Sequence, residues 1–542
     1  MSDLFLKTTN SDGTDLRLQE VGASDPAPTA PNLMWTLTGL ITPSVVKLAV
    51  RLDGVSSDIT IETSETSDFA NTQSHGPYAT QDGPDFTGED YYLAQCRMEG
   101  LSPDTLLYAR ISVDGTAQTD HIVEFRTPPA IGDPHSFSFG FASCNRGQYH
   151  STQPYSNHPI WEEINNQGLR LFVHMGDWGY PDNGFDEIRN PGHNDGDHPR
   201  YWWLNFDGNM ATARQKELFR TTPISYSWDD HDFGPNNGMG YAEDGTKRVY
   251  RDPAVKAYRT TIPHDEALPG DTDAVYWSYV IGRVRFMKTD ERSEAVYNTG
   301  DRYGATQLQW IKDQIMAAKA AGQIIVWELS VPWIISEDSP HGGHTSDDAW
   351  PQIGFDDRDE LGDFVTAEGM SNSIVAIVGD MHALAADDGR NNEWGGFPVL
   401  HGAPIDQGNS TKGGPYQIGP FTNSENQWAK CDVTDNGGDT IAVDYQGYDV
   451  GAEIGAATLS LTMQVPEGDT VTRTGVVTRD GDTVAGADVV FITRANLLAN
   501  ATAQTTTDAS GAYSAEIPTG EEMVGIALEG ADGDSTPFTE GA

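Results

Sequence analysis

The amino-acid sequence predicts a central α/β domain between two β-rich domains, with boundaries near residues 132 and 466. Before the first boundary, short β-branched runs alternate with Gly, Asp and Pro turns. Between the boundaries, β-prone runs alternate with helical patterns, as in layered α/β domains. Beyond the second boundary, short β-prone runs return. A chain of 542 residues with 37% hydrophobic content is long enough for about three domains with real cores.

Residues 1–132 are predicted to form an N-terminal immunoglobulin-like β-sandwich. Its expected strands are 45–52, 59–63, 106–113 and 121–126. The segment Leu101-Ser102-Pro103-Asp104-Thr105, followed by Tyr108, resembles the corner of fibronectin type III modules. Residues 127–130 are rich in proline and are predicted to be the linker to the next domain.

Residues 133–466 are predicted to be the α/β domain. A short helix is expected over 159–165, with proline in its first turn. A longer helix is expected over 306–321, where Gly322 ends it and one face carries Leu308, Ile311, Ile315 and Ala318. Further strands are expected at 284–289 and 323–329.

Residues 467–542 are predicted to form a small C-terminal β-sandwich. Its β-prone runs are 470–477, 487–492 and 507–514. The pieces 486–489 and 507–513 resemble carboxypeptidase-regulatory-like β modules. Such modules are usually spacers or adhesion elements, and no chemistry is expected from this one.

The charge of the chain is strongly negative, with 81 acidic against 33 basic residues and a net charge of −48. A polyanion of this kind disfavours binding to nucleic acid and to anionic membranes. Because the acidic residues are dispersed, we interpret them as a halophilic or marine adaptation and not as a recognition surface. No apolar run is long enough for a membrane span. No signal peptide is visible either, although an export signal that had been removed would leave the same sequence, so the compartment stays open.

Four apolar runs end in residues that can bind cations. The run 137–143 leads to Cys144, 169–175 to Gly176, Asp177 and Tyr180, 223–228 to the run Asp229-Asp230-His231-Asp232, and 373–378 to Gly379-Asp380-Met381-His382. Open α/β sheets bind their ligands at the carboxyl ends of strands. One such ending is ordinary turn chemistry, and Cys144, Tyr180 or the two aspartates could each be structural. Four endings in one domain predict a metal site.

The residue types predict two ions with different preferences. Asp177 can bridge them because each carboxylate oxygen can bind one ion. The thiol of Cys144 and the phenol of Tyr180 ionise with difficulty, so a set of Cys144, Asp177, Tyr180 and His382 favours trivalent iron over zinc or magnesium. Oxygen ligands remain for a hard divalent ion such as calcium or manganese, namely Asp229 or Asp230 and Asn236 or Asn237.

These motifs resemble those of the PhoD-like alkaline phosphatase family of the calcineurin-like metallophosphatases. The similar segments are 141–144, 174–180, 228–236 and 379–382, with weaker similarity at 289–294 and 395–400. Their order and their strand context agree with the family, and the resemblance covers about residues 30–466. Two departures concern substrate preference: Asn145 follows Cys144 where glutamine is frequent, and Glu291 interrupts the segment before Arg292.

The resemblance implies an αββα metallophosphatase sandwich that hydrolyses phosphate monoesters and diesters with Fe³⁺ and Ca²⁺, zinc or manganese being less favoured. It implies an iron site formed by Cys144, Asp177, Tyr180 and His382. It implies a calcium site formed by Asp177, Asn236 and one of Asp229 or Asp230. Asp380 is a weaker candidate, as a support or as a ligand. The family also favours an extracellular or periplasmic location.

The hypothesised mechanism is an in-line attack on phosphorus by metal-activated hydroxide. His231 is the candidate general acid for the leaving oxygen. Arg146 and Arg292 could bind the phosphate through bidentate hydrogen bonds, or each could be an ion-pair partner. The alternative function is a non-catalytic surface or adhesion protein with a structural metal domain, and a nuclease or phospholipase is a third. The complete set of candidate ligands favours a phosphoester hydrolase, and the charge disfavours nucleic acid; the natural ester and the oligomeric state stay open.

Overall fold

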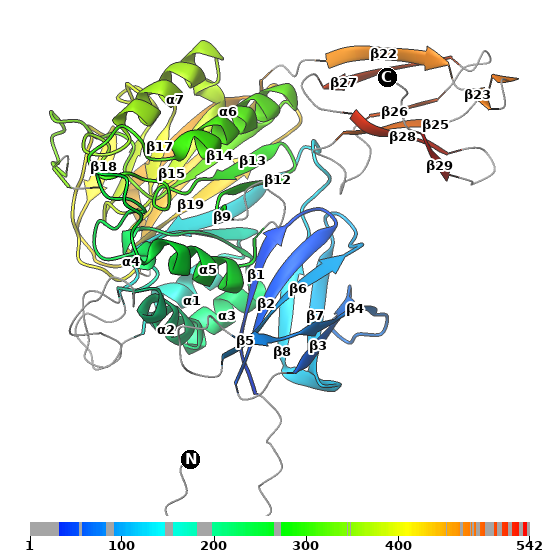
Figure 1. Cartoon of the computed structure of the whole chain (residues 1–542), viewed down its shortest axis with the longest axis horizontal. Coiled ribbons are helices and arrows are strands. Elements are labelled where there is room, and N and C mark those ends of the chain that lie inside the picture. The colour runs from blue at the N-terminus through cyan, green and yellow to red at the C-terminus, as the bar shows by residue number, and fades with distance from the viewer. Residues whose placement is uncertain are drawn as a thin grey trace, which may run out of the picture.

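The computed structural model describes residues 32–466, apart from 54–56, 83–90, 147–154, 181–197, 265–272, 344, 347 and 451, together with strand backbone between 470 and 538. Residues 1–31 of the predicted N-terminal domain therefore lie outside the described residues. Two large β-sheets face each other in the centre, with helices on their outer sides (Figure 1).

The first sheet has ten strands in the order β21-β20-β19-β9-β10-β11-β1-β2-β6-β5. In chain order these are β1 (Asn32–Ile41), β2 (Val45–Asp53), β5 (Gln81–Asp82), β6 (Tyr91–Glu99), β9 (Phe137–Ala142), β10 (Leu171–Met175), β11 (Ile224–Ser227), β19 (Gln427–Thr434), β20 (Thr440–Asp449) and β21 (Ala452–Gln464). Strands β9, β10 and β11 are parallel neighbours. The loops that follow them therefore leave the sheet at one edge.

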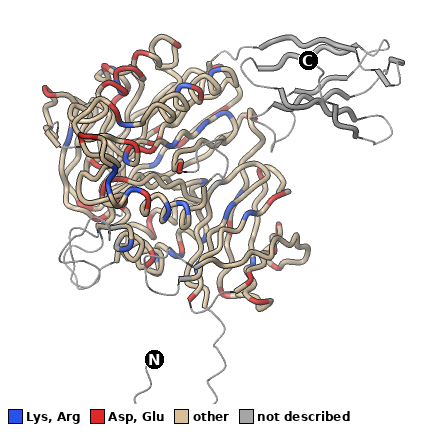
Figure 2. Tube along the Cα trace, in the orientation of Figure 1, with Lys and Arg blue, Asp and Glu red and all other residues tan. Residues whose placement is uncertain are grey.

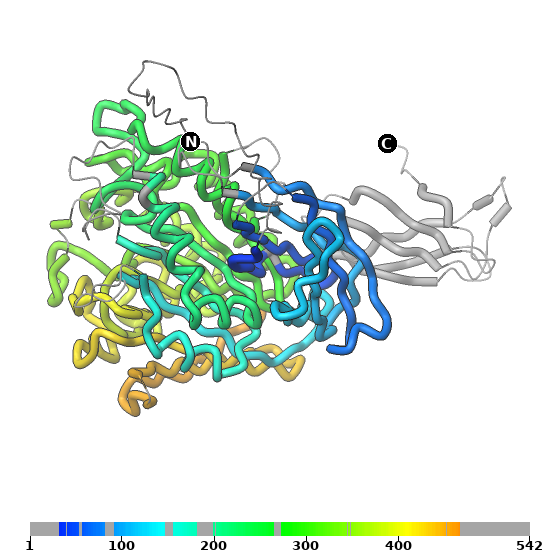
Figure 3. Tube along the Cα trace, turned by 90° about the horizontal axis from the view of Figure 1, so that it is seen from below, coloured from blue at the N-terminus to red at the C-terminus, as the bar shows by residue number. Residues whose placement is uncertain are grey.

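Four N-terminal strands, namely β1, β2, β5 and β6, are part of this large sheet. β1 runs parallel to β11, with Gly39 opposite Ile224. A second antiparallel sheet has the order β4-β3-β7-β8 and consists of β3 (Asp58–Ser64), β4 (Gln73–Ala79), β7 (Leu106–Val113) and β8 (Thr116–Arg126). Its apolar residues share one core with those of β2 and β6. Figures 1 and 3 both show these blue strands directly beside the central part.

The second large sheet has seven strands in the order β12-β13-β14-β15-β17-β16-β18. These are β12 (Trp277–Ile281), β13 (Val284–Lys288), β14 (Ile324–Leu329), β15 (Ile374–Val378), β16 (Leu384–Asp387), β17 (Val399–His401) and β18 (Ile418–Phe421). Alternate residues of its strands point to opposite faces. Phe286 and Val326 pack into the core between the two large sheets, whereas Met287 and Trp327 pack into a second core.

Helices cover the outer sides of both sheets (Figure 1). The helices are α1 (Ile160–Asn165), α2 (His198–Met210), α3 (Ala213–Thr221), α4 (Asp230–Phe233), α5 (Arg251–Thr261), α6 (Gly304–Ala320) and α7 (Phe355–Ala367). Both expected helices are present, as α1 and α6. Helix α6 buries Ile311, Ile315 and Ala318 as expected. Leu308, which was expected on the same face, is half-buried, and Gln307 is buried instead. The prediction of an α/β centre is confirmed.

Beyond residue 466 the structure describes strand backbone. The strands are β22 (Thr470–Val476), β23 (Thr478–Arg479), β24 (Asp482–Thr483), β25 (Asp488–Thr493), β26 (Ala503–Thr506), β27 (Ala512–Pro518), β28 (Met523–Glu529) and β29 (Ser535–Phe538). They pair mostly in one four-stranded sheet and one two-stranded sheet. Of the pieces 486–489 and 507–513, which carried the resemblance to a regulatory-like module, residues 486–487 and 507–511 lie outside the described residues.

The acidic residues lie along the whole described chain, with Lys and Arg between them (Figure 2). Among the described residues, no helix has both the length and the apolar character needed to cross a membrane.

The burial of His121 makes the stability of the fold depend on pH. Its side chain is buried beside Thr36, with 2.9 Å between Nε2 and the Thr36 Oγ1 atom. Burial lowers the pKa of His121 to about 4, below the value of about 6.5 in an unfolded chain. Between these values the unfolded chain binds more protons, so stability falls as the pH falls from about 6.5 to 4. At pH 5 this linkage costs about 2 kcal/mol.

We expect the variant His121→Gln to lose less stability than the wild-type protein between pH 7 and pH 5. Urea unfolding at the two pH values measures this difference. An equal loss in both proteins would show that His121 does not carry the acid sensitivity.

Candidate metal centre

Four loops meet at the carboxyl ends of β9, β10, β11 and β15. The backbone N–H of Cys144 donates to the Gly176 carbonyl at 3.1 Å, and that of Asn145 donates to the Asp177 carbonyl at 3.0 Å. A Cβ atom on Gly379 would lie 2.6 Å from the Met175 carbonyl oxygen. Glycine at this position therefore lets the loop after β15 approach the loop after β10.

The backbone is strained where the four loops meet. Cys144, Asp177, Asp380 and His382 all have φ values between 57° and 62°. Residues other than glycine rarely adopt this left-handed conformation, and each costs on the order of 1–3 kcal/mol. Such strain is concentrated at functional sites, where the surrounding contacts maintain it.

The first cluster contains Cys144, Asp177 and His382, whose ligand atoms all lie within 4.8 Å of one another. Tyr180 joins it, because its hydroxyl donates to Asp177 Oδ2 at 2.7 Å and lies 3.2 Å from His382 Nε2. The Nδ1 atom of His382 lies 2.8 Å from the carbonyl oxygen of Gly408. A carbonyl oxygen only accepts hydrogen bonds, so Nδ1 carries the proton and the Nε2 lone pair faces the cluster.

The second cluster contains Asp177, Asp230 and His231, again with ligand atoms within 4.8 Å of one another. Asp177 belongs to both clusters, the position expected of a bridging carboxylate. His231 was predicted as a general acid, and its imidazole Nε2 lies 3.9 Å from Asp230 Oδ2. Its ring also lies against that of Tyr180, with 4.2 Å between the ring centres. The sequence did not indicate that His231 is near enough to Asp177 to be a ligand.

The charges at these loops fit bound cations. Buried carboxylates gather here from Asp177, Asp229, Asp230, Asp348 and Asp380. Arg292 and Lys412 form ion pairs with members of this group. Among the described residues, Asp177 Oδ1 and Asp229 Oδ2 are buried oxygens without a hydrogen-bond partner. Burial raises the pKa of both carboxyl groups, and a bound cation would remove that cost.

Cys144 and Tyr180 fit a strongly polarising ion. Both are buried, and burial raises the pKa of the thiol and of the phenol well above their usual ranges, with the Asp177 charge adding to the effect. Without a cation both groups are therefore neutral at physiological pH. Binding as thiolate and phenolate requires an ion that offsets this penalty.

Arg292 is placed as an ion-pair partner. Its Nε atom donates to Asp229 Oδ1 at 2.7 Å, and its Nη2 atom donates to the same oxygen and to Asp348 Oδ2 at 3.1 Å. Burial opposes the charge, but these carboxylates raise the pKa of Arg292. Asp290 fixes the loop by accepting the Arg292 backbone N–H at 3.0 Å and the Trp228 Nε1–H at 2.8 Å. Of the two readings that the sequence left open for Arg292, the contacts match the ion pair.

Two further predicted residues, Arg146 and Asn236, are less buried than the aspartates. Arg146 is half-buried and donates to Gln407 Oε1 at 3.3 Å. Asn236 is exposed, unlike the buried aspartates. Its neighbour Asn237 has a φ of 59° and donates its backbone N–H to Asp230 Oδ2 at 2.5 Å.

Sequence reasoning assigned no role to three residues that organise the centre. Asp232 accepts the backbone N–H groups of Asp177 at 2.6 Å and of Trp178 at 2.7 Å, which holds the loop after β10. Burial raises the pKa of Asp232 to about 6. Asp348 and Lys412 come from irregular loops with no pattern to indicate them. The capping role of Asp232 was predictable, because it follows Asp229 at helix-capping spacing and the two form a capping box.

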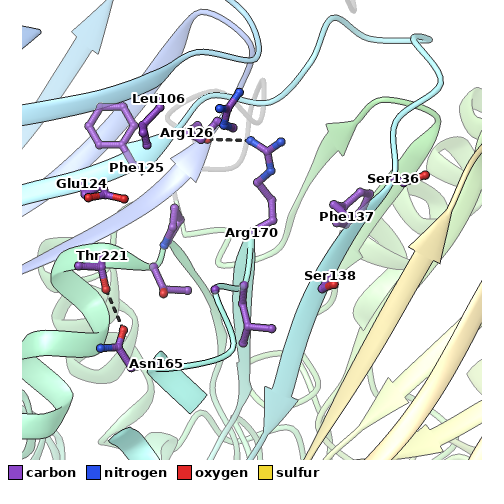
Figure 4. Close-up of a pocket in the computed structure, with 14 residues that line it drawn as sticks. Leu106, Glu124, Phe125, Arg126, Ser136, Phe137, Ser138, Asn165, Arg170 and Thr221 are labelled. Atoms are coloured by element: carbon purple, nitrogen blue, oxygen red, sulfur yellow. Dashed lines mark hydrogen bonds between the residues drawn. The ribbon is translucent and has the colours of Figure 1, made fainter. Parts of the chain in front are cut away.

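A cavity of about 540 Å³ lies away from these loops (Figure 4). Its lining includes Ser136, Phe137, Arg170 and Pro223, which stand at the beginnings of β9, β10 and β11. It also includes Arg126, at the end of β8. The metal loops are at the other ends of these parallel strands, so this cavity is separate from the candidate centre.

Comparisons with known proteins agree with this arrangement. A family model for PhoD-like phosphatase matches residues 139–414. The structure of PhoD matches with a TM-score of 0.59 at 17% identity, over 82% of this chain and 92% of that one. The structure of purple acid phosphatase PPD1 from yellow lupin (Lupinus luteus) seeds matches with a TM-score of 0.54 at 13% identity, over 81% of this chain and 74% of that one.

The two structural matches show a shared fold. A search of curated proteins finds no match. The family match spans half of the chain and includes the Cys144, Asp177 and His382 loops. The chain therefore belongs to the PhoD-like phosphatase family and is a phosphoester hydrolase.

Proposed function

We propose that the chain hydrolyses phosphate monoesters or diesters with a dinuclear metal centre at the carboxyl ends of β9, β10, β11 and β15. The observation that carries this proposal is the position of Asp177. It belongs to both ligand clusters, and its Oδ1 atom is buried without a partner while Oδ2 accepts from Tyr180. A carboxylate held in this way has one oxygen for each ion.

Cys144, Asp177, Tyr180 and His382 would hold the first ion, for which we propose Fe³⁺. Thiolate and phenolate ligands together favour a trivalent ion over zinc. Asp177 and Asp230 would hold the second ion with oxygen atoms, which suits Ca²⁺. Asp229 and Asn236 remain candidate ligands of this ion. Arg292 engages one oxygen of Asp229, and the other has no hydrogen-bond partner among the described residues.

A pair of such ions would lower the pKa of water and stabilise the negative charge that develops on the phosphate. The chain's own residues would bind the phosphate and protonate the leaving oxygen. Arg146 is the half-buried cation proposed to bind a phosphate oxygen. His231 is proposed to give a proton to the leaving oxygen.

The role of each domain is also part of the proposal. We propose that 133–466 is the catalytic domain, that 1–132 is an immunoglobulin-like support, and that 467–542 is a separate β module. The pairing of β1 with β11 supports the second assignment, because it ties the N-terminal strands to the sheet that carries Cys144 and Asp177.

Elemental analysis with a visible spectrum tests the metal assignment. We expect iron near one equivalent per chain and a broad absorption from Cys144 and Tyr180 bound to iron. The variants Cys144→Ser and Tyr180→Phe should each shift or weaken this absorption, whereas Cys431→Ser, at a buried thiol of β19, should leave it unchanged. Zinc or manganese without colour would contradict the iron assignment, and a metal-free active enzyme would contradict the whole centre.

The variant His231→Ala tests the role of the histidine. As a general acid, His231 contributes on the order of 100- to 10,000-fold, and the loss should be much larger for alkyl esters than for activated aryl esters. Comparing kcat/KM for the two ester types measures this difference. Equal losses accompanied by a lower metal content would instead identify His231 as a ligand of the second ion.

A further inference from the structure

Lys412 is a cation at the candidate centre that neither the sequence nor the proposed mechanism explains. Its Nζ atom donates to both oxygens of one carboxylate, to Asp380 Oδ1 at 2.6 Å and to Oδ2 at 2.7 Å. The Asp380 side chain is only 10% exposed and that of Lys412 is 21% exposed. The ammonium group therefore covers the face of Asp380 on which a divalent cation would bind.

The surroundings hold this pair against the metal loops. Asp380 precedes His382 by two residues and shares its left-handed backbone conformation. The segment that carries Lys412 contacts the same loop twice more: Gly408 accepts from His382 Nδ1 at 2.8 Å, and Ser410 Oγ donates to the Met381 carbonyl at 2.9 Å. Lys412 is therefore fixed beside the candidate iron ligand.

The charges keep Lys412 protonated. Burial opposes the ammonium form, but Asp380 and Asp348 outweigh it and raise the pKa of Lys412. Asp348 also accepts from Arg292, which in turn binds Asp229. Asp348 is thus attracted both to Arg292, with which it pairs, and to Lys412.

We propose that Lys412 is a fixed positive charge that occupies the cation position at Asp380, so that Asp380 positions the His382 loop and does not bind metal. The inference rests on the proposed metal centre and limits the number of ions that this centre can bind. An ammonium group and a divalent ion repel each other and cannot share one carboxylate face. Lysine suits this place because its ammonium group is a compact point charge.

Calcium binding to the variant Lys412→Gln tests the proposal. Removing the ammonium group leaves Asp380 and Asp348 as buried carboxylates with less compensation. Since Ca²⁺ prefers such oxygen ligands, we expect the variant to bind one Ca²⁺ more per chain than the wild type, by equilibrium dialysis with Ca²⁺ alone as the probe. Adding Asp380→Asn to Lys412→Gln should remove the extra ion.

Two controls separate this effect from a general change in charge. Lys430→Gln removes a lysine that pairs with Asp432 at 3.0 Å on β19, away from the metal loops. It should bind as much Ca²⁺ as the wild type. Lys412→Arg keeps the charge and should also leave the Ca²⁺ stoichiometry unchanged.

A measurement on the wild type covers the case in which Lys412→Gln does not fold. Crystals soaked in calcium should show no anomalous peak within bonding distance of the Asp380 carboxylate. A peak there, or a folded Lys412→Gln protein with wild-type Ca²⁺ stoichiometry, would overturn the role of Lys412. Absence of all metal binding in the wild type would instead overturn the proposed dinuclear centre, and iron content measured on the same samples distinguishes the two failures.

Discussion

Replacing Asp177 with Asn should abolish hydrolysis while leaving the metal-free protein at least as stable as the wild type. The carboxylate is 1% exposed, and one of its oxygens has no partner among the described residues. It is also common to both proposed ion sites. Losing several kcal/mol of charge stabilisation corresponds to a rate loss of at least about 1,000-fold. Burial raises the pKa of Asp177, because a charge is costly to bury. In the metal-free protein a neutral amide avoids that cost.

The measurements for Asp177→Asn are kcat/KM with added metal, metal content, and thermal unfolding in a chelator. The matched control is Asp388→Asn, at an exposed pair with Arg390, which should change none of the three. An active Asp177→Asn enzyme would contradict the bridging role. A metal-free variant clearly less stable than the metal-free wild type would show that Asp177 is a structural residue.

Replacing Arg292 with Met should destabilise the protein by about 3–5 kcal/mol, the usual effect of removing one partner of a buried ion pair. Arg292 is 1% exposed, and its loss leaves the buried Asp229 without its ion-pair partner and the buried Asp348 with less compensation. We expect activity to fall as well, because Asp229 lies beside the loop of Asp177. A Cβ on Gly176, next to Asp177, would lie only 2.3 Å from the Asp229 Cβ atom.

Denaturant unfolding measures this loss, and Arg390→Met is the control. The Arg390 side chain is 60% exposed in its pair with Asp388, so its removal should cost less than about 1 kcal/mol. Steady-state kinetics then separates the two roles that the sequence allowed for Arg292. An increase in KM with unchanged stability would support a phosphate-binding residue and contradict the structural ion pair.

The strand ends were predictable from sequence because their signals are local. Each of β9, β10, β11 and β15 is an apolar run followed within two residues by Cys144, Asp177, Asp229 or Gly379, and parallel strands bring such endings to one edge. The approach of Cys144, Asp177, Tyr180 and His382 follows from that rule. Whether these residues bind iron stays a prediction.

The contacts of charged residues were not predictable, because their partners are distant in sequence. Arg292 pairs with Asp229 and Asp348, which lie 63 and 56 residues away. Lys412 comes from an irregular loop with no periodicity, so no pattern indicates that it reaches Asp380. The continuity of β1 with β11 was missed for a similar reason: the join is one residue pair, Gly39 opposite Ile224.

The pairing of β1 with β11 limits how far the chain can be shortened from its N-terminus. Cutting the chain at residue 133 would remove β1, and with it the pairing at Ile224, and would leave β11 at the open edge of the sheet. Open edges of this kind recruit strands from other molecules and promote aggregation. We therefore expect a fragment that begins at β1 to be better behaved in solution than one that begins at β9.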